Sequence, residues 1–112
     1  MTQTVTLEFN LAQDDFEDIV DTAGYMIGYW ANEGFLTGET YTLIDGEFST
    51  FEITKDQLEL AMVNIVNGEC DVSKSIQESV KNAITQNEFG EIDGECADVL
   101  IQLCCFDEIV YS

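Results

Sequence analysis

The stretch DDFEDIVDTAGYMIGYW, from Asp14 to Trp30, organises the rest of the chain. It opens with five carboxylates in eight residues and ends with two tyrosines and a tryptophan. At about 100° per residue, a helix from about 12 to 31 would have one apolar side and one acidic side. An acidic face with aromatic rings beside it is typical of a surface that binds a partner.

The apolar side of this predicted helix consists of Phe16, Ile19, Val20, Ala23, Ile27 and Trp30. The acidic side consists of Asp14, Glu17, Asp18 and Asp21, with Tyr25 continuing the stripe and Tyr29 beside it. Gly24 and Gly28 are four residues apart, which would let another backbone approach closely, although each costs roughly 1 kcal/mol inside a helix. A break at Gly24 is the alternative, and it would turn both tyrosines away from the acidic stripe.

The charge of the chain is one-sided. Of 112 residues, 23 are acidic and three are lysines, with no arginine or histidine, so the net charge is −20. Because 46% of the residues are hydrophobic, we expect one folded domain over residues 1–112. Nucleic acids and anionic membranes bind clustered Lys or Arg, so direct binding to either is disfavoured. Basic protein surfaces, metal cations and neutral small ligands remain open as partners.

Neither targeting nor metal-binding patterns are evident. The N-terminus has no positively charged region, and no stretch approaches the ~20 apolar residues of a membrane span. The four cysteines are Cys70, Cys96, Cys104 and Cys105, without a CxxC pair or a histidine to complete a zinc site. We therefore expect four reduced thiols, most of them packed as small hydrophobic side chains, in a cytoplasmic protein that has no cofactor.

Outside the central stretch, local patterns predict the remaining elements. Residues 3–9 alternate as a half-buried strand, and a short loop follows the first helix up to Thr40. Residues 40–54 form a hairpin around Asp45-Gly46, a dipeptide that favours a two-residue type I′ turn. Residues 108–112 are expected to form a last strand.

Three more helices follow the hairpin. Thr54 and Gln57 form a capping box at the start of the first, and Gly68 suits its C-terminal end. Asp71 or Ser73 caps the second, and Asp93 caps the third. Their expected core residues are Leu58, Ala61, Met62 and Ile65; Ile76, Val80, Ala83 and Ile84; and Cys96, Val99, Leu100, Leu103 and Cys104. The order β-α-β-β-α-α-α-β predicts an α+β domain, with helices mainly on one face of a small, mostly antiparallel sheet.

Catalysis has little support in these residues. Without histidine the usual base for a serine or cysteine nucleophile is missing, and with 23 acids any two look paired. The Asp-Gly-Glu sequences at Asp45 and Asp93 do not fit a calcium-binding EF-hand loop, because Tyr41 and Phe89 would stand at its first position. Lys55 and Lys74 lie near predicted helix N-termini, with Lys81 two turns beyond, and these mark an alternative site for a small anionic ligand.

The acidic stripe is the preferred candidate site. From Asp14 to Asp21 a helix rises about 10 Å, so four carboxylates are spaced at roughly 3 Å. That spacing is near the ~3.4 Å between charges along one DNA strand. Tyr25 and Tyr29 would act as anchors in the interface.

Two segments resemble a known group of proteins. These are Ile27-Gly-Tyr-Trp30 and the C-terminal sequence from Ile92 to Gln102, which closes with Phe106-Asp-Glu-Ile-Val-Tyr111. They are similar to a family of small acidic, uncharacterised phage and bacterial proteins, although Asp107 stands where that ending has glycine. The resemblance implies a phage-linked context and no activity.

Three functions therefore compete. The preferred hypothesis is a non-enzymatic anti-defence protein that mimics nucleic acid and occupies a basic host protein surface. One alternative is a protein that sequesters a nucleotide signal near the lysines, at the interface of a homo-oligomer. The other is a small enzyme that uses carboxylates.

Overall fold

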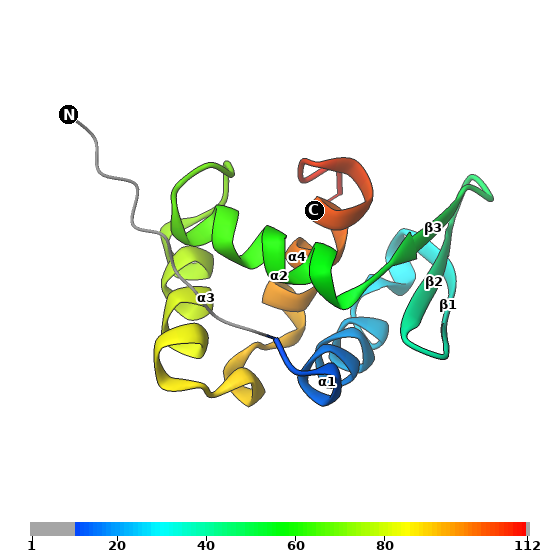
Figure 1. Ribbon diagram of the computed structural model, residues 1–112. Coiled ribbons are helices and arrows are strands. Elements are labelled where there is room, and N and C mark those ends of the chain that lie inside the picture. The colour runs from blue at the N-terminus through cyan, green and yellow to red at the C-terminus, as the bar shows by residue number, and fades with distance from the viewer. Residues whose placement is uncertain (1–10, 112) are drawn as a thin grey trace.

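The computed structural model describes residues 11–111, which form four α-helices and a three-stranded sheet (Figure 1). The elements in chain order are α1 (Gln13–Gly24), the 3-10 turn η1 (Ile27–Tyr29), β1 (Ala31–Thr37), β2 (Thr40–Asp45), β3 (Thr50–Ile53), α2 (Lys55–Val66), α3 (Lys74–Gln86), the 3-10 turn η2 (Phe89–Glu91) and α4 (Gly94–Phe106). The predicted α+β class is confirmed. The strand predicted at residues 3–9 lies outside the described residues.

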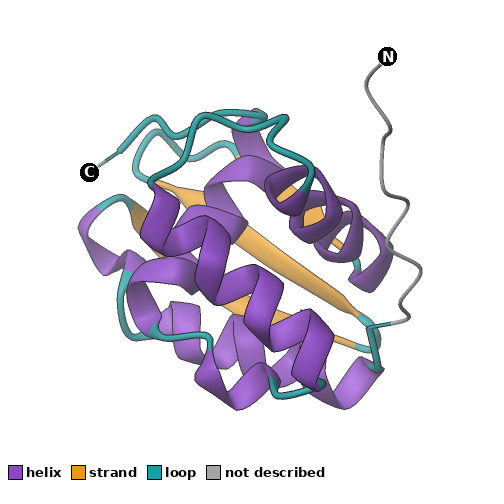
Figure 2. Cartoon of the chain, turned by 90° about the vertical axis from the view of Figure 1, so that its left-hand side faces the viewer, coloured by secondary structure: helices purple, strands orange, loops and turns teal. Residues whose placement is uncertain are grey.

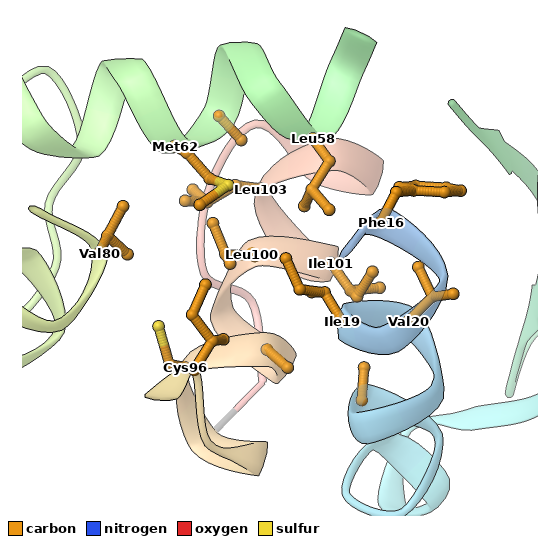
Figure 3. Packing of buried hydrophobic residues seen from close by; sticks show 14 of the residues in the cluster. Phe16, Ile19, Val20, Leu58, Met62, Val80, Cys96, Leu100, Ile101 and Leu103 are labelled. Atoms are coloured by element: carbon orange, nitrogen blue, oxygen red, sulfur yellow. The ribbon is translucent and has the colours of Figure 1, made fainter. Parts of the chain in front are cut away.

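Helix α4 occupies the centre of the core, with α1, α2 and α3 packed around it (Figure 3). Its sequence is apolar on almost every side, which is typical of a helix that is enclosed by others. Seven of its residues are buried: Cys96, Ala97, Asp98, Leu100, Ile101, Gln102 and Leu103. The predicted core positions Val99 and Cys104 are instead half-buried.

Helices α2 and α3 follow the sequence prediction closely, because their signals are local. The Thr54–Gln57 capping box forms, and the Ser73 and Asp93 side chains cap α3 and α4. Gly68 adopts a left-handed φ of 74° just beyond α2, a conformation that glycine tolerates at little cost. All eight predicted core residues of these two helices are buried.

The sheet is antiparallel, in the order β1-β2-β3, and its edges and faces differ in burial. On β2, Tyr41, Leu43 and Asp45 are buried, while the alternate residues are half-buried. Figures 1 and 2 show the helices gathered on one side of the strands. The predicted one-sided arrangement of helices is therefore observed among residues 11–111.

The first helix is shorter than its pattern predicts. It ends at Gly24, where the Met26 N–H bonds to the Ala23 carbonyl at 2.8 Å and tightens the last turn. The predicted helix end and loop up to Thr40 were wrong, because residues 31–37 pair with β2 as strand β1. Nothing lies within 4 Å of a side chain built at Gly24 or Gly28, so the predicted close backbone approach there was also wrong.

The two hairpin connections also differ from the prediction. The β2–β3 hairpin exists, but its connection runs from Asp45 to Ser49 and not through a two-residue turn. The Asp45 carboxylate accepts hydrogen bonds from the backbone N–H groups of Glu47 and Ser49, which favours the longer loop. A two-residue turn instead joins β1 to β2, with Gly38 at a positive φ of 62°.

No strand forms at residues 108–111, so that prediction was wrong for the described part of the segment. The Gln102 amide takes the place of a neighbouring strand. Its Oε1 accepts hydrogen bonds from Val110 N at 2.9 Å and Tyr111 N at 2.8 Å, and its Nε2 donates to the Tyr111 carbonyl at 3.0 Å. The Tyr111 ring then stacks on Trp30, with ring centroids 5.4 Å apart, which holds the tail against the core.

Candidate partner-binding surface

The acidic stripe forms on α1 as its periodicity predicts. Asp14, Asp18 and Asp21 are exposed, and Glu17 is half-buried at the margin. The buried residues Phe16, Ile19, Val20 and Ala23 lie on the other side of the helix. At 1.5 Å per residue, Asp14 and Asp21 are separated by about 10 Å along the axis.

The two tyrosines predicted to extend this stripe lie differently, because α1 ends at Gly24 and the 3-10 turn η1 follows. Tyr25 keeps helical dihedral angles (φ −79°, ψ −15°) and is 85% exposed, so it extends the stripe by one turn. Tyr29 lies in η1, and its hydroxyl donates a 2.5 Å hydrogen bond to Asp98 on α4. Burial and the Asp98 carboxylate raise the pKa of Tyr29 to about 12. We therefore define the acidic stripe as Asp14, Glu17, Asp18, Asp21 and Tyr25.

Carboxylates elsewhere are also exposed, since Asp56, Glu78 and Glu95 project from α2, α3 and α4. The negative charge is thus spread over the molecule and not confined to α1. Among the described residues, no lysine forms an ion pair, which requires a nitrogen within 4.0 Å of a carboxylate oxygen. What distinguishes the stripe is regular helical spacing next to an exposed aromatic ring.

The lysines of the alternative ligand site are not brought together. Lys55 borders a hollow of about 220 Å³, while Lys74 and Lys81 are exposed on α3. The other lining residues are Gln13, Glu39, Thr40, Thr54 and Asp56. Gln13 Nε2 is buried there, without a hydrogen-bond partner among residues 11–111. Two carboxylates against one ammonium make this hollow unfavourable for a phosphate.

A second hollow, of about 340 Å³, lies between α2 and the C-terminal end of α4. It is lined by Gln57, Leu60, Ala61, Asn64, Glu69, Cys70, Leu103, Cys104 and Asp107. All four cysteines of the chain are free thiols. Burial raises the pKa of Cys104 to about 12, and raises that of Cys70 as well, so both are protonated near neutral pH. A protonated thiol is a poor nucleophile, because the thiolate is the reactive form.

The sequence reasoning missed a buried polar network between η1 and α4. Asp98 is 8% exposed, and its carboxylate accepts hydrogen bonds from Trp30 Nε1 at 2.9 Å, Gln102 Nε2 at 2.9 Å and the Tyr29 hydroxyl. The available signal was two polar residues four apart in an otherwise apolar helix. The network ties Tyr29 and Trp30, which follow the end of α1, to Asp98 on α4.

Comparison with protein-family models, curated proteins and solved structures finds no significant match. The resemblance to phage and bacterial proteins therefore stays a prediction. No helix in the described part of the chain is long and apolar enough to cross a membrane. Within the same residues, no group of three or more cysteine or carboxylate side chains is placed to hold a metal ion.

Proposed function

We propose that this chain is a non-enzymatic accessory protein, of the anti-defence type found in phages, that binds a basic, nucleic-acid-binding surface of a host protein. The acidic stripe on α1 would occupy the positions of phosphates, and Tyr25 would pack against the partner. The observation that carries the proposal is a run of helically spaced carboxylates on α1, three of them exposed, with which no lysine among residues 11–111 forms an ion pair.

The charge and shape of the stripe support this proposal. A convex helix with one sign of charge fits a groove that receives a nucleic-acid strand, whereas a small ligand needs a concave site. Complementary charge raises the association rate and fixes the orientation of the partner, and salt weakens it. Tyr25 adds an aromatic group of the kind that is enriched at binding hot spots.

Capture from a bacterial lysate at low salt, with the full chain as bait, tests the proposal. We expect retained proteins to be nucleic-acid-binding proteins that elute with a short DNA duplex as well as with salt. The stripe variant Asp14→Asn/Asp18→Asn/Asp21→Asn should lose them. Retention of the same proteins by the stripe variant would refute the proposed site.

Total charge needs a matched control. The variant Asp71→Asn/Glu78→Gln/Glu88→Gln removes three exposed carboxylates from the region of α3. Both triple variants change the net charge from −20 to −17, since each loses three negative charges. We expect the control variant to retain the captured proteins. Equal losses in both variants would mean that only the overall charge attracts the partner, and the α1 site would be rejected.

A further inference from the structure

Strand β1 has one edge that is free of any partner among residues 11–111, and the proposed function does not use it. It pairs with β2 on one side only, and no described element pairs with its other side. Every residue from Asn32 to Thr37 is exposed, whereas β2 alternates between buried and half-buried residues. Such an edge presents unpaired backbone N–H and C=O groups, which can pair with another strand. In Figure 1 the sheet stands at one end of the molecule, with the helices on one side of it.

The usual protection of a free edge is largely missing from β1. Edge strands are commonly short or carry lysine or proline, but β1 has seven residues and contains neither. Its register shift lies between Ala31 and Glu33, so pairing with β2 is regular from Glu33 to Thr37. Exposed apolar side chains, Phe35 and Leu36, project from its two faces. The opposite edge, β3, has only four residues and leads directly into α2.

The charges around β1 indicate which kind of strand would pair there. Residues 31–54 contain no basic side chain, and Glu33 shares the outer face of β1 with Phe35. Glu52 lies on β3, with β2 between it and β1, so Glu33 is the carboxylate that would neighbour a strand added at the free edge. Opposite charges on adjacent strands contribute roughly 0.2–1 kcal/mol, and like charges are destabilising by a similar amount. A second copy of this chain would therefore bring carboxylates together, whereas a basic strand would complement them.

We infer that the free edge of β1 accepts an extended segment of a partner protein as a fourth strand, with lysine or arginine alternating with apolar residues. Backbone hydrogen bonds would supply affinity, and Glu33 beside Phe35 on the outer face of β1 would select a strand in which basic and apolar residues alternate. This surface lies on a different element from the acidic stripe. It does not depend on the function proposed above.

A synthetic nine-residue peptide in which valine and lysine alternate, with valine at both ends and at the centre, tests this inference. Its control has the central valine replaced by proline, which keeps the charge and removes a strand hydrogen bond. With the full chain, we expect the first peptide to bind at least tenfold more tightly and to slow hydrogen exchange at β1 amides. Equal binding of the two peptides, or slowed exchange on α1 and not on β1, would overturn the inference.

A matched pair of variants separates the edge from overall charge. Leu36→Lys lies on β1, whereas Leu60→Lys makes the same change on α2, and the two side chains are 40% and 60% exposed. We expect the first to weaken peptide binding at least fivefold and the second less than twofold. Equal weakening would overturn the inference. A wild-type dimer in sedimentation that Leu36→Lys dissociates would also overturn it, because the occupant would then be a second copy. In the stripe variant, the peptide should still slow hydrogen exchange at the β1 amides. The two proposals can therefore fail separately.

Discussion

Replacing Asp98 tests whether the buried network holds the chain after the break in α1. The Asp98→Ala variant leaves Trp30 Nε1 without its acceptor in a side chain that is only 4% exposed. A buried donor without a partner costs about 1–3 kcal/mol. Gln102 Nε2 keeps its bond to the Tyr111 carbonyl, and the Tyr29 side chain is exposed enough for its hydroxyl to bond to water, so these two groups add little. We expect a net loss of about 1–3 kcal/mol in unfolding free energy, most of it from the Trp30 donor.

The Asp98→Asn variant separates hydrogen bonding from shape. Asparagine keeps one oxygen for Trp30 and Gln102, and its amide can donate to the Tyr29 hydroxyl. We therefore expect a smaller loss, of about 1 kcal/mol. Urea unfolding followed by the fluorescence of the single tryptophan measures both variants, with the exposed Glu78→Ala as a control for removing one charge. The reasoning is refuted if Asp98→Ala lies within about 0.5 kcal/mol of wild type, which is the usual range for surface substitutions.

Three further predictions concern other parts of the fold. Phe48 is 79% exposed at a left-handed φ of 65°, so Phe48→Gly should not destabilise the chain and should gain up to about 1 kcal/mol in urea unfolding, while Phe48→Ala stays strained. Gly34→Ala would place a methyl group against the Tyr41 ring and hydroxyl, and should cost about 1–3 kcal/mol. A smaller cost in the Tyr41→Phe background would support that contact, and an unchanged cost would argue against it. Burial raises the pKa values of Cys96, Cys104 and Cys105 from 9.0 to about 12, and burial with Asp98 raises that of Tyr29 from 10.0 to about 12. The folded state therefore holds these protons more tightly than the unfolded state. Stability should be retained below pH 9 and fall between pH 9 and 12. A midpoint of urea unfolding that stays constant between pH 9 and 12 would contradict this prediction.

The sequence predicted the parts of the fold that depend on neighbouring residues. The caps at Thr54, Ser73 and Asp93 each use a side chain within one turn of the backbone group that it binds. The apolar and acidic sides of α1 also follow from the helical repeat alone. Their agreement with the structure shows that local hydrogen bonding and periodicity determine these elements.

The errors arose where distant contacts outweigh the local pattern. The sequence ANEGFLT of β1 has no apolar alternation, and it is a strand because it pairs with β2. The tail from 107 to 111 has strand-forming residues, but the Gln102 side chain binds its backbone groups in place of a neighbouring strand. For the candidate site, the acidic stripe was predictable, whereas the position of Tyr29 depends on its bond to Asp98.

The most direct test of the central claim compares how the two triple variants compete with DNA for a captured host protein. The host protein is held at fixed concentration with a labelled duplex, and each form of this chain is titrated in at two salt concentrations. We predict that the wild type and the Asp71/Glu78/Glu88 variant displace DNA at similar concentrations, that the Asp14/Asp18/Asp21 variant needs at least tenfold more, and that raised salt weakens all three. Displacement by the stripe variant at the wild-type concentration would contradict the claim that the α1 carboxylates take the place of phosphates.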